Sequence, residues 1–176
     1  MNDIATEKNA ESGTTLRNFM ANRGAIIIKE MKPIGSTHGE YGSFLEVETI
    51  VLRVIRGTTQ NDAHGVLLII KSAGNESEEK VHLDFDEIEE LINALQVIRH
   101  TSTELGRNKT DYTEVIYATK DNAKFGFYQS NSEQMGFVNI GYQGQMFHIV
   151  HNNIEIEKLL QLAVEHLRTK GAEIIA

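Results

Sequence analysis

The chain has 176 residues, no cysteine and a formal net charge of −8 at pH 7. This length suits one domain or two closely packed halves, and the missing cysteines exclude disulfides, thiolate metal sites and cysteine nucleophiles. The acidity, which is concentrated between residues 24 and 101, disfavours general binding to nucleic-acid phosphates or anionic lipid.

No apolar run approaches the length of a membrane span, and the first residues lack the basic and apolar regions of a signal peptide. We therefore expect a cytoplasmic protein without a membrane partner. Residues 1–12 are polar and predict a mobile tail. Residues 14–22 predict a short helix, with Thr14 or Thr15 as its N-cap and Gly24 as its stop signal.

Four strands are predicted next, because β-branched and apolar residues recur between turn signals. From Thr49 onward both sides of the second strand are apolar, so we expect either cover on both sides or a β-bulge there. The predicted strands cover residues 25–31, 43–56, 66–71 and 81–85, with Pro33 and Gly35 closing the first, a polar loop over 57–65 and a charged turn over 75–79.

An amphipathic helix follows the fourth predicted strand. Asp86 and Glu89 have the spacing of a capping box, and Glu87 favours the positive end of the helix dipole. Residues 101–111 predict a polar connector. The apolar stripe of the helix consists of Ile88, Leu91, Ile92, Leu95 and Ile98.

The same order of elements recurs in the second half. Asn152 and Glu155 repeat the capping-box spacing before a second amphipathic helix over residues 154–169. When the two helices are aligned, Leu159 matches Leu91 and Asn152 matches Asp84 as the cap of the first helix. The predicted strands cover residues 113–119, 124–129, 135–140 and 146–150, with turns at 120–122 and 141–144.

The sequence therefore predicts an α+β fold of tandem ββββα repeats, preceded by a short N-terminal helix. Two antiparallel sheets are expected, each covered by the helix that follows it. The predicted boundaries are 1–23 for the tail and short helix, 24–105 for the first unit and 106–176 for the second. The two units are expected to pack as one globular domain.

This tandem four-strand-plus-helix order resembles the PUR repeat and, more loosely, Whirly and PC4-type single-strand-binding proteins. The resemblance covers residues 24–169 and rests on element order. It implies two intertwined units, with helices packed between curved antiparallel sheets, and binding to single-stranded nucleic acid. No binding residue is carried over, because the basic and aromatic sheet residues of PUR proteins cannot be placed residue by residue in this chain.

A tentative binding face is predicted from basic and aromatic side chains on strands. Lys124 and Tyr128 share one side of their strand, opposite to Phe125 and Phe127, which are expected to face the core. Single-strand binding needs aromatic platforms and a positive groove, and the alternative is an ordinary solvated sheet face. The tentative face consists of Arg53, Lys71, Tyr117, Lys124 and Tyr128.

No metal, cofactor or catalytic site is predicted. His148 and His151 would share a face only on a helix, and their segment predicts a strand that leads into the helix cap, so packing or surface roles are expected. The carboxylates of residues 84–90 lack the ligand order of a calcium loop and predict capping plus a solvated helix face. The other histidines, at 38, 64, 82, 100 and 166, are scattered along the sequence.

Three functions from different classes follow from these observations. The first is a non-catalytic binding or interaction module for a protein or another macromolecule. The alternative is a single-stranded nucleic-acid-binding protein of PUR-like or Whirly-like architecture, and the third is an enzyme with an unrecognised site. The acidity favours the first over the second, and the lack of a catalytic constellation favours both over the third. The ligand and the oligomeric state stay open, with a dimer among the expectations.

Overall fold

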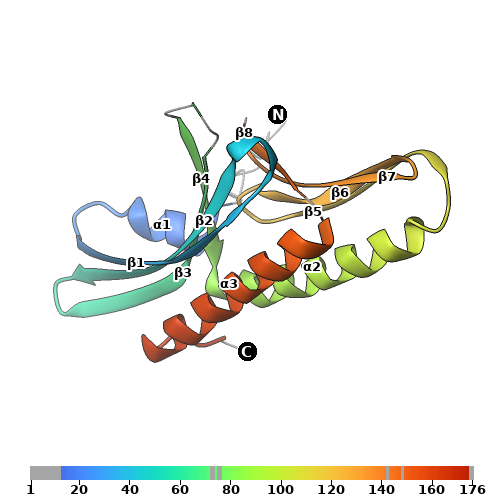
Figure 1. Cartoon of the computed structure of the whole chain (residues 1–176). Coiled ribbons are helices and arrows are strands. Elements are labelled where there is room, and N and C mark those ends of the chain that lie inside the picture. Colours follow the sequence, from blue (N-terminus) through green and yellow to red (C-terminus); the bar gives the residue numbers. More distant parts are fainter. Residues whose placement is uncertain (1–12, 72–73, 75–76, 142, 148, 175–176) are drawn as a thin grey trace, which may run out of the picture.

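The computed structural model describes residues 13–71, 74, 77–141, 143–147 and 149–174. Within these residues the fold is α+β, with three α-helices and two antiparallel sheets of four strands each (Figure 1). The strand orders are β1-β2-β3-β4 and β5-β6-β7-β8, so each sheet is a simple meander. The predicted mobile tail, residues 1–12, lies outside the described residues.

Both halves use the same order of strands and then a helix. The first half contains α1 (Thr15–Met20), β1 (Ile26–His38), the 3-10 helix η1 (Glu40–Gly42), β2 (Phe44–Arg56), β3 (Thr59–Lys71), β4 (Glu78–Asp84) and α2 (Phe85–Leu105). The second half contains β5 (Thr110–Ala118), β6 (Lys124–Asn131), β7 (Glu133–Ile140), β8 (Gln143–Phe147) and α3 (Ile149–Thr169).

Three strands of the first sheet, β1, β3 and β4, are longer than the sequence indicated, whereas β2 matches its prediction within one residue. β1 continues past Pro33 because an edge strand tolerates a residue without an amide hydrogen, and an irregularity in pairing between Pro33 and Gly35 takes up the break. The prediction of a polar loop over residues 57–65 was wrong. Gly57, at φ 60°, opens a tight turn, and the chain pairs with β2 again from Thr59.

The second half of β2 is covered on both sides. Val51 belongs to the main core, whereas Ile50 and Leu52 lie in a smaller cluster beneath α1. The pairing irregularity nearest Thr49 belongs to β1, between Pro33 and Gly35, opposite Glu48 and Val47 of β2, while β2 itself pairs with β3 without interruption.

Helix α1 covers the outer side of the first sheet. Thr14 is its N-cap, as predicted, and its hydroxyl accepts the N–H of Arg17 at 3.2 Å. Leu16 is fully buried. A Cβ added at Gly65 of β3 would lie 2.5 Å from Leu16 Cδ1 and 2.1 Å from the carbonyl oxygen of Leu83, so the close approach of α1 and β4 to β3 requires glycine there.

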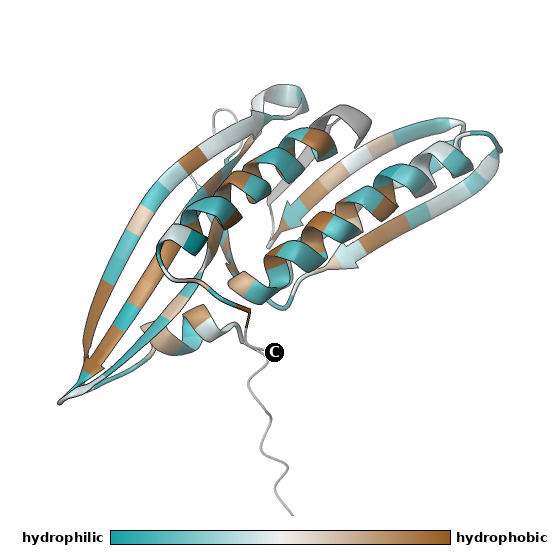
Figure 2. Ribbon diagram, turned by 90° about the horizontal axis from the view of Figure 1, so that it is seen from below, coloured by the Kyte–Doolittle hydropathy of each residue, from teal (hydrophilic) through white to brown (hydrophobic). Residues whose placement is uncertain are grey.

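Helix α3 lies on the first sheet, although it follows the second sheet in the chain (Figures 1 and 2). Its Leu159 sits over Gly35 of β1, where an added Cβ would be 2.7 Å from Leu159 Cδ2. Just beyond the helix, Lys170 Nζ binds Glu30 Oε1 of β1 at 2.5 Å. The expectation that each sheet is covered by the helix following it does not describe this arrangement, because α3 crosses to the other half.

Helix α2 contacts both sheets, and its C-terminal end is fixed to the second one. Gln134 of β7 donates to the carbonyl oxygen of Ser102 at 2.7 Å, and Gln129 of β6 donates to that of Leu105 at 3.1 Å. Both carbonyl oxygens also accept a backbone N–H, Ser102 from Gly106 at 2.9 Å and Leu105 from Asn108 at 3.1 Å, so each glutamine adds a second donor at the helix end. The helix consequently reaches Leu105, where the sequence predicted a polar connector from residue 101.

One cluster of buried residues joins both sheets and both long helices. Phe125 and Phe127 of β6 are fully buried within it, as predicted, and burial of two large aromatic side chains is a major apolar contribution to the core. Leu91 of α2 and Leu160 of α3 belong to the same cluster. The two halves therefore share a single hydrophobic interior.

The start of α2 lies at the cap that the helix alignment matches with Asn152, two residues before the predicted capping box of Asp86 and Glu89. Its N-cap is Asp84, not Asp86, and Glu87 Oε2 accepts the backbone N–H of Asp84 at 3.1 Å. The capping spacing of Asp86 and Glu89 also occurs two residues earlier, at Asp84 and Glu87. Because β4 ends at Asp84, the helix begins at the earlier position.

The start of α3 also differs from the prediction. The helix begins at Ile149, so the predicted cap, Asn152, lies inside it, and the predicted strand over 146–150 ends at Phe147. Ile149 and Val150 are β-branched, and the strand preference of such residues reflects how they pack against neighbours more than an intrinsic backbone preference. In this chain they begin α3, the helix that packs on the first sheet.

Candidate binding face and the junction that positions it

The two members of the tentative face from the first half lie on opposite sides of their sheet. Lys71 of β3 pairs with Phe44 of β2, so these two side chains lie on the same side of the sheet. Arg53 is separated from Phe44 by an odd number of positions along β2, and its side chain therefore points to the other side. Each is neutralised locally, since Arg53 binds Asp62 at 3.2 Å and Lys71 binds Glu46 at 3.2 Å. The structure therefore does not bring Arg53 and Lys71 together.

The three members from the second half are also divided. Tyr117 pairs with Phe125 and packs against the main core, on the inner side of the second sheet. Lys124 and Tyr128 lie on the outer side, as expected from their parity. Only these two of the five residues share a surface.

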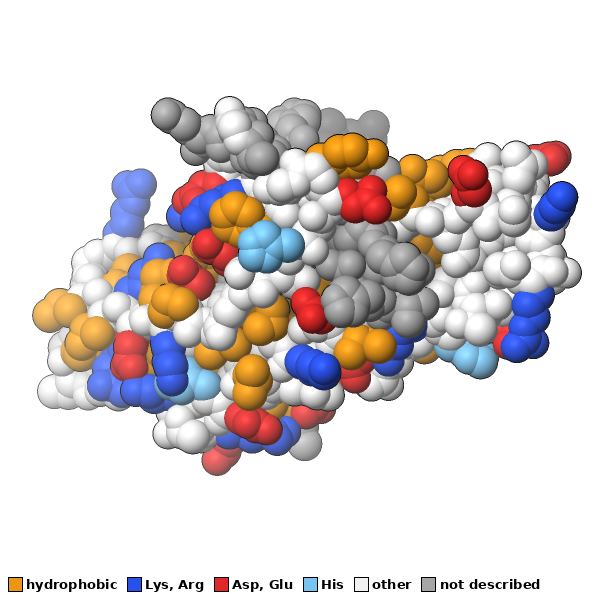
Figure 3. Space-filling model, in the orientation of Figure 1, with side chains coloured by type: hydrophobic (Ala, Val, Ile, Leu, Met, Phe, Trp, Pro, Cys, Tyr) orange, Lys and Arg blue, Asp and Glu red, His pale blue; other side chains and the backbone are white. Residues whose placement is uncertain are grey.

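The outer side of the second sheet carries a partly exposed aromatic and apolar surface, which we call the tyrosine face and define by Tyr112, Ile116, Lys124, Tyr128 and Met135. The rings of Tyr112 and Tyr128 stack, with centroids 6.3 Å apart and an interplanar angle of 20°. Tyr112 is 61% exposed and Ile116 is 47% exposed. In Figure 3, hydrophobic side chains gather along the upper side of this sheet.

Sequence reasoning missed Tyr112 and Ile116 as members of this face. Tyr112 lay between the predicted connector, 101–111, and the predicted strand, 113–119, whereas β5 begins at Thr110 and contains an irregularity between Thr110 and Thr113. The signal available in the sequence was the period-two alternation of β5. Ile116 lies two positions after the charged Glu114, so both side chains point to the same, exposed side of the strand.

Gly126 shapes the middle of the tyrosine face. It pairs with Ile116 on one side and with Phe137 on the other. A Cβ at this position would lie 2.0 Å from the carbonyl oxygen of Val115, so β5 crosses β6 too closely for any side chain. Phe137 shares this side of the sheet but is buried.

The tyrosine face is not cationic. The strand pairing places Glu114 and Glu133 on the same side as Lys124. Acidic and basic side chains are also interspersed over the surface seen in Figure 3, without a large patch of one sign. The face therefore lacks the summed positive potential that binding to a phosphate backbone requires.

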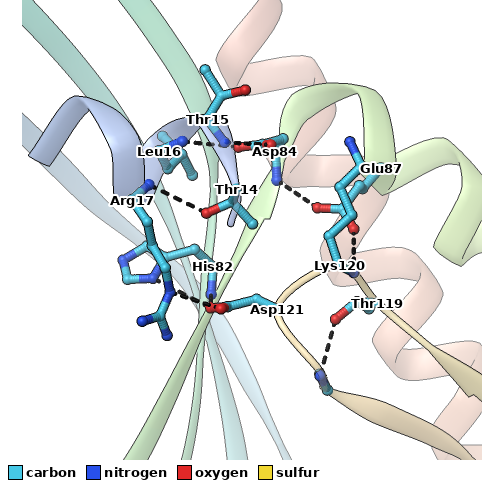
Figure 4. A network of polar contacts seen from close by, with 11 residues as sticks. Thr14, Thr15, Leu16, Arg17, His82, Asp84, Glu87, Thr119, Lys120 and Asp121 are labelled. Atoms are coloured by element: carbon cyan, nitrogen blue, oxygen red, sulfur yellow. Dashed lines mark hydrogen bonds and ion pairs between the residues drawn. The ribbon is translucent and has the colours of Figure 1, made fainter. Parts of the chain in front are cut away.

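A polar junction holds the β5–β6 hairpin against the first sheet (Figure 4). Its residues come from three segments that are far apart in the sequence: the start of α1, the β4–α2 connection and the turn between β5 and β6. Arg17 Nε binds Asp121 Oδ1 at 2.7 Å, and the backbone N–H of His82 donates to Asp121 Oδ2 at 2.9 Å. One turn carboxylate thus ties α1 and β4 to the hairpin.

Asp84 links the first sheet to α1. Its buried carboxylate accepts the N–H of Thr15 at 2.7 Å and that of Leu16 at 3.0 Å. These are two of the amide groups that the first turn of a helix leaves unpaired, and a negative charge is favourable at that end.

Glu87 links the start of α2 to the second sheet. Its Oε1 accepts the N–H of Lys120 at 2.8 Å, while Oε2 accepts that of Asp84. Burial raises the pKa of Glu87, and the two backbone donors oppose that shift. The prediction of a solvated carboxylate cluster was therefore wrong for Asp84 and Glu87, which are buried, although capping was correctly expected.

His82 borders Asp121 on the outer side of β4. Its Nδ1 is buried, has no hydrogen-bond partner and lies 3.7 Å from Asp121 Oδ2. Burial lowers the pKa of His82, Asp121 acts against this shift, and Arg17 and Lys29 add to it. The imidazole is consequently held neutral beside an Arg–Asp ion pair.

The junction positions elements and offers no evident chemistry. Both oxygens of Asp84 and of Glu87 are engaged by backbone N–H groups, which leaves neither as a free base. Within the described residues no group of three or more His, Asp or Glu side chains is arranged to hold a metal ion. Of the predicted histidine pair, His148 lies outside the described residues and His151 lies in α3.

No protein-family model, no curated protein and no solved structure matches this chain. Among the helices of the described residues, none combines the length and the apolar character that crossing a membrane demands.

Proposed function

We propose that this protein is a non-catalytic binding module that holds a partner protein on the tyrosine face. The observation that carries this proposal is the stacked pair Tyr112–Tyr128 next to Ile116, with Tyr112 61% and Ile116 47% exposed on one side of one sheet. Tyrosine supplies a large, rigid contact area with a polar end, and such residues dominate binding energy at protein interfaces.

The charge of the face favours a protein over a nucleic acid. Aromatic platforms bind single strands when a basic groove follows the phosphates, and the described residues of this face combine Lys124 with Glu114 and Glu133. The single-strand-binding function that the PUR-like element order implies is the second candidate, because a stacked tyrosine pair is also a base-stacking surface.

We also propose that the two halves are copies of one ββββα unit. Each half forms a four-stranded meander followed by a helix of 21 residues. The crossed helices and the shared core support the intertwined arrangement that the PUR-like resemblance implies. In this arrangement each half covers apolar surface of the other. The tyrosine face lies on the second ββββα unit.

Site-specific photo-crosslinking tests the binding function. A photoreactive amino acid replaces Tyr112 in one variant and Val97 in the other, and both proteins are exposed to an extract of the cells that produce the chain. Val97 is the matched control because it is 62% exposed on α2, on the opposite side of the second sheet from the tyrosine face. We expect one discrete protein adduct from position 112 that is lost with Ile116→Lys and absent from position 97. Equal adducts from both positions would contradict the proposal.

A fluorescence titration with short single-stranded DNA and RNA distinguishes the two candidates. At about 50 mM salt, where phosphate contacts are strongest, we expect no saturable binding. Saturable binding that disappears in the double variant Tyr112→Ala, Tyr128→Ala would replace the protein partner with a nucleic acid at the same face.

A further inference from the structure

The outer edge of β1 carries exposed apolar side chains. β1 is the first strand in its sheet, and no described strand pairs with its outer edge. Ile26 is 65% exposed and Ile28 is 47% exposed. In Figure 2 the hydrophobic beginning of β1 is the lower end of the outermost strand on the left, away from both long helices. Helix α1 packs mainly against β2, β3 and β4, and on its side of the sheet the partly buried Ile27 lies against the same small cluster, which leaves Ile26 and Ile28 exposed on the other side.

The second half of this edge is better protected against pairing with another strand, because the first half carries charges only at Lys29, Glu30 and Lys32 and has no proline or bulge. Natural edge strands are usually interrupted by proline, bulges or charges. Pro33 and the pairing irregularity that ends at Gly35 interrupt the second half of β1. Its first half, from Ile26 to Lys32, keeps a regular register with β2 and presents an unbroken row of backbone groups.

We propose that two copies of this chain associate through antiparallel pairing of β1 with β1, centred on Ile27. A two-fold axis perpendicular to a sheet passes midway between one residue and its own symmetry mate, and it sets residues of equal parity opposite each other. With Ile27 opposite Ile27 of the second copy, Ile26 of each copy lies opposite Ile28 of the other, on the same side of the joined sheet.

This register is the one that suits the sequence of the edge. It covers both exposed isoleucines with isoleucine, and because β1 begins at Ile26 after a bend at Gly24 and Ala25, the pairing is confined to Ile26–Ile28 and sets no like charges against each other. A centre at Lys29 or at Glu30 would set like charges against each other, and a centre at Ile28 would set Ile26 against Glu30. Three consecutive isoleucines can pair with the same three isoleucines of another chain. This apolar self-complementarity favours a second copy of the protein as the partner of the edge. The paired segment is short, so the dimer is weak and reversible.

Sedimentation velocity over a range of protein concentrations tests the proposal. We expect a monomer–dimer equilibrium whose dissociation constant rises at least about tenfold in Ile26→Lys and in Ile28→Lys, a change worth about 1.4 kcal/mol. Val97→Lys is the matched control, because Val97 is also an aliphatic residue, 62% exposed on α2 and outside the tyrosine face, and it should leave the dimer unchanged. A monomer at all concentrations, or equal weakening by all three variants, would overturn the proposal.

A cysteine variant locates the axis. Because the chain has no cysteine, Ile27→Cys introduces a single thiol, and its symmetry mate would lie within disulfide range across an antiparallel pair. With oxidised glutathione we expect a covalent dimer from Ile27→Cys and none from Val97→Cys, whose thiol is exposed on α2. Both variants are checked by circular dichroism, so that misfolding is recognised. A folded Ile27→Cys that stays monomeric under oxidation would refute this register.

Discussion

Asp84 shows how one buried carboxylate sets the position of a whole helix. Its two oxygens hold the N–H groups of Thr15 and Leu16, and its own N–H is held by Glu87. Hydrogen bonds to charged groups are stronger than neutral ones, and a buried group left without a partner is costly. The attachment of α1 to the first sheet therefore depends on this residue.

We expect Asp84→Asn to lower the free energy of unfolding by about 2 kcal/mol, since the amide cannot accept at both positions and loses the favourable charge. Urea denaturation followed by circular dichroism measures the change. The control is Asp86→Asn, which removes an exposed ion pair with Lys120 and should cost less than about 1 kcal/mol. Equal losses in the two variants would show that Asp84 does not anchor α1.

His82 predicts a dependence of stability on pH. Its pKa is lowered from 6.5 by burial, so the unfolded chain binds a proton at His82 before the folded protein does. Its contribution to stability is therefore complete above about pH 6.5 and is lost as the pH falls toward the folded pKa. The raised pKa of Glu87 makes its own contribution to stability increase as the pH falls. This contribution is the same in the wild type and in a His82 variant.

We expect the urea midpoint of the wild-type protein to fall more between about pH 7.5 and 5.5 than that of His82→Gln, which cannot titrate. His166 also has a lowered pKa, caused first by burial and then by Lys32 and Lys170. The variant His166→Gln therefore serves as a comparison at a second site. The same pH dependence in the wild type and in His82→Gln would argue against a neutral, buried His82.

The strands β5 and β6 are the elements on which the proposed function depends. Their crossing at Gly126 leaves no room for a Cβ, because the backbone of Val115 occupies that space. We expect Gly126→Ala to lower the free energy of unfolding by about 2 kcal/mol or more, since the obstacle is backbone and cannot turn away. Gly13→Ala is the control, because a Cβ there meets its nearest neighbour at 3.5 Å. A fully stable Gly126→Ala would contradict the close crossing.

Element order could be predicted from this sequence because it follows from local patterns. The period-two alternation, the turn residues and the apolar stripe around Leu91 identified the strands and the first long helix. Chain contacts over long distances could not be predicted. No local pattern indicates that Asp121 reaches His82 or that Leu159 packs over Gly35, because these contacts depend on how the sheets and helices are arranged.

The candidate site was predicted only in part for the same physical reason. Parity along β6 placed Lys124 and Tyr128 correctly on one side. Parity alone cannot tell which strands adjoin, so Arg53, Lys71 and Tyr117 were joined to a face that they do not share. The neighbouring β5, which contributes Tyr112 and Ile116, completes the face.

At the scale of the whole molecule, the crossed helices make each half incomplete without the other. The helix α3 carries Leu160 and Leu167 into the core on the first sheet, and α2 is fixed to the second sheet through Gln129 and Gln134. Removing either half would expose the apolar surface that it covers. The tyrosine face and the β1 edge are consequently held at fixed positions on one folded unit.

Separate production of residues 1–106 and 107–176 tests this central claim most directly. Each fragment is followed by circular dichroism during urea denaturation, alone and in an equimolar mixture. We predict that neither fragment alone unfolds cooperatively and that the mixture recovers one cooperative transition, because each long helix needs the sheet of the other half. A cooperative transition of either isolated fragment, at the midpoint of the full chain, would contradict the shared interior and the crossed helices on which the account rests.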